Sequence, residues 1–264
     1  MIPTPSTSHV SFNNVYEPAE DSFLLLDTLS SDSEVAFLKH RFSPTEPSGA
    51  NTTCPLILEV GTGSGVILAF VAAHANTLLG TSNVLALGID INEFACKATS
   101  ETVESALRPA LSHGNGSATG LSSEATLLDC INADLVSVIR PHSIDILIFN
   151  PPYVPSETIP TPPSRHESSK HSTWERNMNI LALATDGGAD GMEVTKKLLD
   201  QLPTVLNETR GVAYVLLCAQ NQPDKVKQEI RNWSPAWSVE TVRQSGKRGG
   251  WERLQIIKIM RNGV

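Results

Sequence analysis

The sequence has few cysteines and no long apolar segment. Its 264 residues contain only four cysteines, Cys54, Cys96, Cys130 and Cys218, with no CxxC pair and no histidine at metal-ligand spacing. This scatter predicts buried thiols in a reducing compartment rather than a disulfide framework or a metal site. No apolar run approaches the roughly 20 residues of a membrane helix, and the N-terminus lacks the order of a secretory signal. We therefore expect a protein of the cytoplasm or the nucleus.

Positive charge is also scarce. The chain has 20 Lys and Arg against 28 Asp and Glu, which gives a formal net charge of -8. A protein that holds nucleic acid mainly by releasing its counterions carries the opposite balance, so nucleic-acid binding of that kind is not expected. Hydrophobic residues make up 40% and charged residues 18%, which excludes a wholly disordered chain and predicts a buried core.

Short apolar or β-branched runs alternate with helical stretches from residue 56 onward. This alternation is typical of parallel strands joined by crossover helices. Strands are expected at Leu56–Val60, Val84–Ile89, Thr126–Ile131, Ile144–Phe149, Val212–Cys218, Val239–Val242 and Leu254–Met260. The glycine-rich segment 244–250 is too short for a crossover helix, so the last two strands are predicted to form an antiparallel hairpin.

Several segments are expected to be helical. An N-terminal helix begins within residues 16–27, with Asp21 or Ser22 near its cap, and Val66–Ala73 is apolar enough to be buried against the sheet. Glu193–Leu199 and Asp224–Trp233 are amphipathic. Three polar stretches, about 30–54, 109–124 and 155–172, are interpreted as loops or local disorder. The organisation expected is one domain over residues 1–264, with an N-terminal arm and helix over 1–54 and the core over 55–264.

A glycine-rich turn follows the first predicted strand. Residues 58–65 read LEVGTGSG, and glycines at a strand-to-helix turn let the backbone pass close to a ligand. The spacing is GxGxG, whereas a dinucleotide site uses GxGxxG. Such a turn is weak support for a ligand site by itself, because it also occurs as a plain tight turn.

Carboxylates follow the next two predicted strands. Asp90 ends the second strand, where it could accept two hydrogen bonds from ribose hydroxyls or simply be solvated. Asp134 follows the third strand, where it could accept from an adenine amino group. The order of strand, glycine turn, acid, strand and acid specifies an adenosine pocket better than any one of these features.

The fourth predicted strand ends in Asn150-Pro151-Pro152-Tyr153. Two consecutive prolines have fixed φ and no N–H, so they stop the strand and hold Asn150 extended. This conformation aims the Asn150 side-chain oxygen and a proline carbonyl beyond the sheet edge, where both can accept from a planar NH2. Tyr153 could cover such a group by stacking. The alternative is a proline-rich turn with a capping asparagine.

Because it contains both the glycine turn at 58–65 and the NPPY motif at 150–153, the sequence resembles the S-adenosylmethionine-dependent methyltransferases. The enzymes it resembles methylate an amide or exocyclic nitrogen of a planar group. The segments YEPAEDSFLLL (16–26), GIDIN (88–92) and NPPYV (150–154) make it similar to the HemK-like eukaryotic and archaeal release-factor glutamine-N5 methyltransferases. The likeness extends from residue 13 to the end, apart from the polar stretches. It implies an α/β, Rossmann-like class I methyltransferase fold, with a seven-stranded, mostly parallel sheet and an antiparallel terminal hairpin.

The resemblance also implies a reaction and a site. The reaction is N5-methylation of the glutamine in the Gly-Gly-Gln motif of the eukaryotic class I translation release factor, with S-adenosyl-L-methionine as cofactor and no metal. The implied cofactor contacts are Ser22, Glu59, Gly61, Gly63, Asp90, Asp134, Leu135 and Asn150. The implied catalytic residues are Asn150, Pro151, Pro152 and Tyr153, of which Asn150, Pro151 and Tyr153 also bind substrate. Glu20 and Asp21 are weaker candidates near the methionine part, because carboxylates suit a sulfonium cation.

An amide nitrogen is a poor nucleophile because its lone pair is delocalised into the carbonyl. Acceptors at Asn150 Oδ1 and the Pro151 carbonyl would orient its two N–H groups and favour positive charge on nitrogen as the new bond forms. No strong general base is then needed, since positioning and charge-directed acceptors lower the barrier.

A partner is expected at the third predicted strand. In the usual strand order of this fold, 3-2-1-4-5-7-6, this strand lies at an edge, and Thr126–Ile131 holds no Lys or Pro to discourage pairing. Either residues 109–124 fold over the edge, or a partner adds a strand to it. The resemblance supplies a candidate for the second case, the small zinc-binding activator subunit shared by several eukaryotic methyltransferases. We expect a heterodimer centred on Leu127–Ile131.

Other functions remain open on the sequence alone. A DNA or RNA adenine-N6 methyltransferase would use the same NPPY acceptors, although such DNA enzymes usually carry a target-recognition domain and flip the base into the pocket. Neither that domain nor a basic face is present in the sequence. Another protein substrate, such as a histone lysine, would use planar-group acceptors poorly. A non-enzymatic scaffold would have no need of the glycine turn, both acids and NPPY together.

Overall fold

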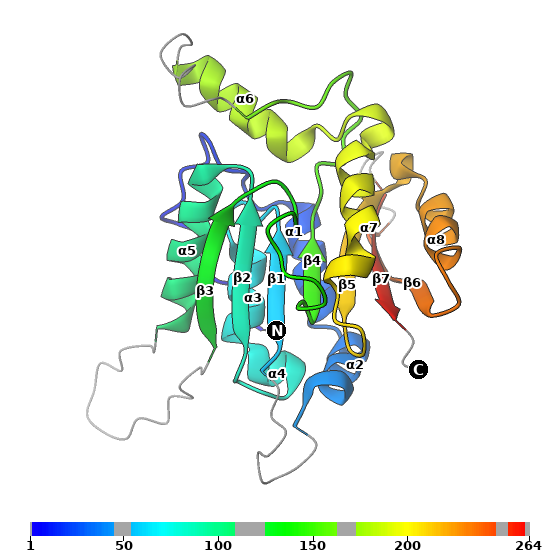
Figure 1. Ribbon diagram of the computed structural model, residues 1–264. Coiled ribbons are helices and arrows are strands. Elements are labelled where there is room, and N and C mark those ends of the chain that lie inside the picture. Colours follow the sequence, from blue (N-terminus) through cyan, green and yellow to red (C-terminus); the bar gives the residue numbers. More distant parts are fainter. Residues whose placement is uncertain (1, 45–53, 109–124, 163–172, 247–252, 262–264) are drawn as a thin grey trace, which may run out of the picture.

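A single seven-stranded sheet forms the centre of the protein (Figure 1). The computed structural model describes residues 2–44, 54–108, 125–162, 173–246 and 253–261. The strand order is β3-β2-β1-β4-β5-β7-β6, with β1 to β5 parallel and β7 antiparallel to both neighbours. The strands are β1 (Leu56–Val60), β2 (Leu85–Asp90), β3 (Thr126–Asn132), β4 (Ile146–Phe149), β5 (Val212–Cys218), β6 (Trp237–Gln244) and β7 (Leu254–Arg261). The predicted topology, including the terminal hairpin, is confirmed.

The central strands are buried on both faces, as expected for a parallel sheet covered by helices on either side. All seven residues of β5 and all four of β4 are buried. Successive side chains alternate between two cores, so that Ile148 packs in one and Leu147 in the other. This burial explains why the strand sequences read as continuous apolar runs.

Helices α1 to α5 contribute to one core, and α7 and α8 to the other. The first group is α1 (Glu20–Leu29), α2 (Asp32–Phe42), α3 (Val66–Ala73), α4 (Ala75–Leu79) and α5 (Glu93–Leu107). The second is α7 (Glu193–Val205) and α8 (Pro223–Arg231), preceded by the short 3-10 helices η2 (Ala189–Gly191) and η3 (Ala219–Asn221). Helix α6 (Thr173–Thr185) lies across the upper end of the sheet in Figure 1, where the parallel strands end.

The expectation of a loop over residues 30–54 is wrong for its first part, which forms α2. Leu38 and Phe42 of this helix are buried in the core although the flanking sequence is polar. The polar Glu34 is also buried, where it accepts a hydrogen bond of 2.7 Å from the Tyr214 hydroxyl and pairs with Lys258 at 3.0 Å. Residues 45–53 lie outside the described part of the chain.

Smaller expectations are confirmed in part and corrected in part. Cys54 is half-buried, whereas Cys96, Cys130 and Cys218 are buried, and none of the four is in a disulfide. Helix α1 begins at Glu20, with Ala19 at its N-cap, so Asp21 and Ser22 lie in its first turn. The polar stretches 109–124 and, from residue 163 on, 155–172 lie outside the described residues. The single domain over residues 1–264 and the cytoplasmic or nuclear location stay predictions.

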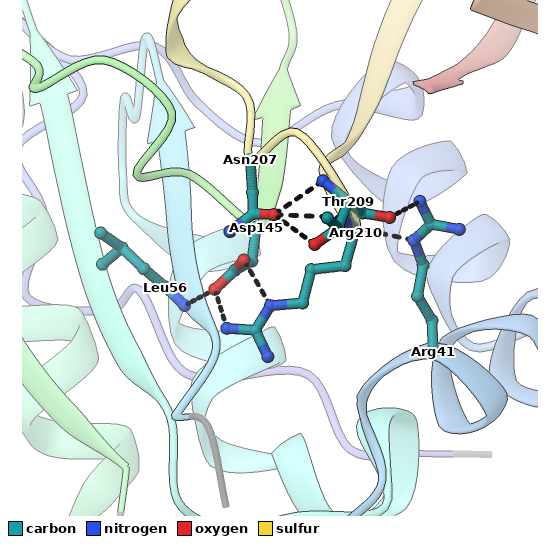
Figure 2. A network of polar contacts seen from close by, with 6 residues as sticks. All are labelled: Arg41, Leu56, Asp145, Asn207, Thr209 and Arg210. Carbon is teal, nitrogen blue, oxygen red and sulfur yellow. Dashed lines mark hydrogen bonds and ion pairs between the residues drawn. The ribbon is translucent and has the colours of Figure 1, made fainter. Parts of the chain in front are cut away.

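The amino ends of β1, β4 and β5 are joined by a network of polar contacts (Figure 2). Asp145 lies just before β4 and accepts two hydrogen bonds of 2.8 Å from the Arg210 guanidinium. One of its oxygens also accepts from the Leu56 N–H at 2.9 Å. Arg41 of α2 donates to the Arg210 carbonyl oxygen at 2.8 Å. This end of the sheet is therefore closed by groups that satisfy one another.

The described residues contain neither a membrane-spanning helix nor a cluster of metal ligands. None of the described helices combines the length and the apolar character needed to cross a membrane. Within the same residues, no cluster of three or more His, Cys, Asp or Glu side chains could hold a metal ion.

Candidate active site

The turn after β1 leads tightly into α3. Gly61, Gly63 and Gly65 all have positive φ, which explains the GxGxG spacing better than a dinucleotide fingerprint would. A Cβ at Gly65 would lie 2.5 Å from the Thr99 Cα, so only glycine permits the turn to pack this closely on α5. Thr99 also donates a hydrogen bond of 2.8 Å to the Thr62 hydroxyl. Contacts with Thr99 of α5 thus hold the turn in place at the carboxyl end of β1.

Glu59 joins the end of β1 to the start of α3. It is 1% exposed, and its Oε2 accepts a hydrogen bond of 2.9 Å from the Leu68 N–H, one of the donors that a helix start leaves without an intrahelical partner. Burial raises the pKa of the Glu59 carboxyl well above its ordinary value, although the Leu68 hydrogen bond opposes this shift. A cation bound nearby would favour its ionised form.

Asp90 ends β2 and faces the glycine turn. Its Oδ2 accepts from the Gly63 N–H at 3.0 Å, and its Oδ1 from the Asn92 N–H at 2.8 Å. Burial raises the pKa of this carboxyl, and hydrogen bonds from the Gly63, Asn92 and Ile91 backbone and from the Thr62 side chain oppose the shift. Asp90 lines both cavities described below, where its sequence position predicts a contact with ribose hydroxyls.

Asn150 is held by a residue from a distant part of the sequence. Its Nδ2 donates a hydrogen bond of 3.1 Å to Oδ2 of Asp21, which is 3% exposed and also accepts from the Tyr16 hydroxyl at 3.1 Å. Asn150 Oδ1 is buried and has no hydrogen-bond partner among the described residues. Because Asp21 can only accept when ionised, it fixes the amide with its nitrogen inward and its oxygen available to a ligand.

Two cavities meet at this end of the sheet. The first, of about 70 Å³, is polar and is lined by Ser22, Glu59, Asp90, Asn150 and the glycine turn, among others. The second, of about 330 Å³, is lined by Asp134 and by apolar groups such as Leu135, Phe149 and Pro152. Gly61, Asp90 and Leu183 belong to both linings, so the two cavities share walls.

Most of the predicted site residues therefore come together. Those that line one or both cavities are Ser22, Glu59, Gly61, Gly63, Asp90, Asp134, Leu135, Asn150 and Pro152. Pro151 is buried, and Tyr153 packs partly against the core that contains α1, so neither is among the lining residues. Asp21 lies behind Asn150, and Glu20 is exposed at the start of α1. The roles assigned to individual residues stay predictions.

Sequence reasoning missed the part of the wall that α6 provides. Ile180, Leu183 and Ala184 line the first cavity, and Leu183 lines the second. Their spacing of i, i+3 and i+4 puts them on one helix face, which is the signal that could have revealed them. The segment 159–162 also lines the second cavity, although its sequence predicts only a polar loop.

The cavities fit S-adenosylmethionine by their chemistry. Among the described residues that line the first cavity, none is Lys, Arg or His, while Glu59 and Asp90 are buried acids, which suits a sulfonium cation. The second cavity has the apolar walls that a planar adenine needs, with Asp134 as an acceptor for its amino group. Asn150, whose Oδ1 is buried without a hydrogen-bond partner among the described residues, is one of the residues that line the first cavity.

Comparison with known proteins decides the family. No family model matches the chain. It is 32% identical over 270 residues to the eRF1 methyltransferase catalytic subunit mtq2 of Schizosaccharomyces pombe, which covers 100% of this chain and 97% of that protein. The chain belongs to this methyltransferase family. It is also 29% identical to methyltransferase HEMK2 of Homo sapiens, over 98% of this chain and 97% of that protein.

A solved structure supports the fold of this methyltransferase. The Mtq2–Trm112 complex of E. cuniculi, described as responsible for methylation of the eRF1 translation termination factor, superposes with a TM-score of 0.53 at 20% identity. The match covers 94% of this chain and 99% of that one. The methyltransferase is thus a Rossmann-like enzyme that uses S-adenosylmethionine, as the sequence predicted.

Proposed function

We propose that this methyltransferase transfers a methyl group from S-adenosylmethionine to the side-chain nitrogen of the glutamine in the Gly-Gly-Gln motif of the class I release factor, as catalytic subunit of a heterodimer. The observation that carries the proposal is the buried, unpartnered Asn150 Oδ1 beside the polar cavity. A buried acceptor without a donor costs about 1–3 kcal/mol, so its retention points to a ligand that supplies the N–H. The full-length similarity to the eRF1 methyltransferase catalytic subunit favours glutamine as that ligand.

In the proposed reaction, S-adenosylmethionine supplies an electrophilic methyl group on sulfur. Asn150 Oδ1 accepts one N–H of the glutamine amide, and the Pro151 carbonyl accepts the other. These acceptors orient the nitrogen lone pair and stabilise positive charge as it develops on nitrogen. Asp21 keeps Asn150 in the required orientation through its hydrogen bond to Nδ2.

The buried acids have separate tasks. Asp90 and Asp134 would hold the ribose and the adenine amino group, and Glu59 would favour the cationic part of the cofactor at the bottom of the polar cavity. The C–N bond would form as the C–S bond breaks, with the neutral thioether S-adenosylhomocysteine as leaving group. None of these carboxylates needs to remove a proton beforehand, because the positively charged amide nitrogen loses its proton to water afterwards. Positioning and charge stabilisation by the acceptors are thus the expected sources of the rate enhancement.

The test is to co-express the chain with the small zinc-binding activator, add S-adenosylmethionine and the release factor, and map the methyl group by fragmentation mass spectrometry. One methyl group on the Gly-Gly-Gln glutamine, absent with Asn150→Ala, is the expected result. Methylated adenine in added DNA or RNA, with no methyl group on the release factor, would show that the acceptors were identified correctly and their substrate wrongly.

The proposed partner surface is the outer edge of β3. Leu128 is 50% exposed, and a groove of about 520 Å³ runs between residues 125–129 and the end of α5, where Glu104 and Arg108 lie. The register of β3 against β2 shifts at this point, since Ala86 pairs with Leu127 and Leu87 with Asp129. A partner would therefore meet an exposed leucine at a bulge within Leu127–Ile131 rather than an uninterrupted strand. Coverage by residues 109–124 concerns a segment outside the described residues.

Leu128→Lys tests this surface. A charge at the exposed leucine should prevent the zinc-binding activator from co-purifying with the chain, while thermal stability of the isolated chain stays unchanged. Val138→Lys is the matched control, because Val138 is 56% exposed and lies outside β3. Equal recovery of the heterodimer with both variants would rule out the β3 edge as the interface.

A further inference from the structure

Asn221 connects the segment after β4 to the end of β5. It is 2% exposed and lies in η3, directly after β5. Its Nδ2 is within hydrogen-bond distance of three backbone oxygens, those of Tyr153 at 3.2 Å, Asp190 at 3.0 Å and Gly191 at 3.3 Å. Its Oδ1 accepts from the Cys218 N–H at 2.8 Å. One side chain thus joins three segments that are far apart in the sequence.

The Tyr153 carbonyl is enclosed on several sides. The Cys218 thiol lies 3.9 Å from this oxygen, as a weak donor beside the Asn221 amide. Gly191 has φ +66°, and a Cβ at this position would lie 2.0 Å from the same oxygen. These contacts therefore hold the Tyr153 backbone in one position.

Residues 154–156, which follow Tyr153, are also held by backbone hydrogen bonds. Val154 donates its N–H to the Thr185 carbonyl at 2.9 Å and accepts from the Gly187 N–H at 2.8 Å. Ser156 exchanges hydrogen bonds of 3.0 Å with Gly188, through its N–H and through its hydroxyl oxygen. Residues 185–191 thus form a backbone support alongside residues 153–156.

The two prolines make this support relevant to catalysis. Pro151 and Pro152 each have a fixed φ, so the four-residue segment from Asn150 to Tyr153 behaves as a stiff unit. Asp21 holds one end of the unit through Asn150, and Asn221 holds the other through Tyr153. A shift at either end changes where the acceptors at Asn150 and Pro151 point.

We propose that Asn221 is a positioning residue for methyl transfer, which fixes the Tyr153 carbonyl and thereby the acceptors that orient the substrate amide. The inference rests on the proposed function, because the group being oriented is the glutamine amide. Asn221 does not line either cofactor cavity, so its effect concerns turnover rather than cofactor affinity. Only a side chain with both a donor and an acceptor satisfies the carbonyls and the Cys218 N–H at once.

The test uses Asn221→Asp in the purified heterodimer with the release factor as substrate. The carboxylate has the same shape but turns two N–H donors into an acceptor that faces three carbonyl oxygens. We expect kcat to fall about tenfold to a hundredfold, the scale of a misplacement near 1 Å, with the S-adenosylmethionine Kd within about twofold of wild type. Gly191→Ala should give the same pattern, because its methyl group displaces the same carbonyl. This second variant decides the matter if Asn221→Asp does not fold.

Asn207→Ala is the matched control. Asn207 is also a turn asparagine beside β5, but at the opposite end, where its Oδ1 accepts from the Thr209 and Arg210 N–H groups (Figure 2). It should lower thermal stability and leave kcat per folded molecule unchanged. Wild-type kcat in both Asn221→Asp and Gly191→Ala, or an equal loss of kcat in Asn207→Ala, would overturn the positioning role.

A spectroscopic measurement separates this inference from the proposed function. The chain has three tyrosines, so fluorotyrosine labelling gives three ¹⁹F resonances, of which Tyr153→Phe identifies one. Asn221→Asp should shift or broaden the Tyr153 resonance and leave those of Tyr16 and Tyr214 in place, whereas Asn207→Ala should change none. If the wild-type heterodimer fails to methylate the release factor, the proposed function fails. An unchanged Tyr153 resonance in an otherwise active enzyme contradicts only the role of Asn221.

Discussion

The two ends of the parallel sheet differ in whether their buried polar groups have partners within the protein. At the amino end, Asp145 is 2% exposed, and both of its oxygens accept from Arg210 (Figure 2). At the carboxyl end, Asn150 Oδ1 is buried without a partner. Glu59 is buried at the same end of the sheet, and none of the described residues that line its cavity is Lys, Arg or His.

This contrast distinguishes groups that stabilise the fold from groups that we expect to bind a ligand. The Asp145 carboxylate at the amino end is neutralised within the protein by Arg210, so this pair contributes to the stability of the fold. The carboxyl-end groups keep unused acceptor capacity, which costs stability unless a cofactor and a substrate supply the missing donors. Substitutions at the two ends should therefore change different measured quantities.

The largest effect is expected for Asn150→Ala at the carboxyl end. Loss of the acceptor oxygen should lower turnover at least about a hundredfold, the scale of removing one preorganised polar contact. S-adenosylmethionine should still bind, because the glycine turn and Asp90 are untouched. Methyl transfer to the release factor and calorimetry with the cofactor measure the two quantities. Normal turnover by the variant would end the assignment of Asn150.

Asp145→Ala should have the converse effect at the amino end. Removing the carboxylate takes away the acceptor of the Leu56 N–H and one ion-pair partner of Arg210, whose side chain is 21% exposed, so we expect a loss of about 1–3 kcal/mol of unfolding free energy. Turnover per folded molecule should not change. Urea unfolding provides the measurement, with Glu101→Ala as control. Glu101 pairs with Lys97 at 4.0 Å on an exposed face of α5, so its loss should cost under about 0.5 kcal/mol.

Asp21→Asn sharpens the comparison within the active site. An asparagine can donate as well as accept, so the Asn150 amide is no longer held with its oxygen toward the cavity. We expect turnover to fall about tenfold, as for the loss of one hydrogen bond to a charged group. Asp27→Asn is the control on the same helix, since Asp27 is exposed and pairs only at 3.7 Å with Arg243. Equal kinetics of the two variants would assign Asp21 a merely structural role.

Glu59→Gln should give the smallest effect, visible as a pH dependence of stability. The pKa of Glu59 is raised in the folded state above its ordinary value of 4.5, so the folded state holds the proton more tightly than the unfolded state does. Its contribution to stability is complete below that value and is lost as the pH rises through the folded-state pKa. Unfolding free energy should thus fall less steeply with rising pH in Glu59→Gln. Asp90 keeps part of the slope, because its pKa is also raised. Identical slopes would show that Glu59 does not titrate as described.

The success of the sequence predictions depended on how local each signal is. The strands, the glycine turn and the segment at Asn150 are each encoded within a few consecutive residues, because β-branched runs, glycines and prolines restrict the backbone directly. The sequence does not predict helix α2, because its buried groups, Leu38, Phe42 and Glu34, pack against residues that are close only after folding. Helix α6 was missed as a cavity wall for the same reason.

The sequence by itself determined the alternation of strands and helices, and it placed acidic groups at the carboxyl ends of strands β1 and β2 and an amide directly after β4. Because parallel strands end at one edge of a sheet, this order alone gathers Glu59, Asp90 and Asn150 there. Only the tertiary structure decided which of these groups keep a vacant lone pair. Asp21 is 129 residues from Asn150 and Asn221 is 68 from Tyr153, so no local pattern could reveal either contact. A hydrogen bond depends on distance and direction in space, and the fold sets both.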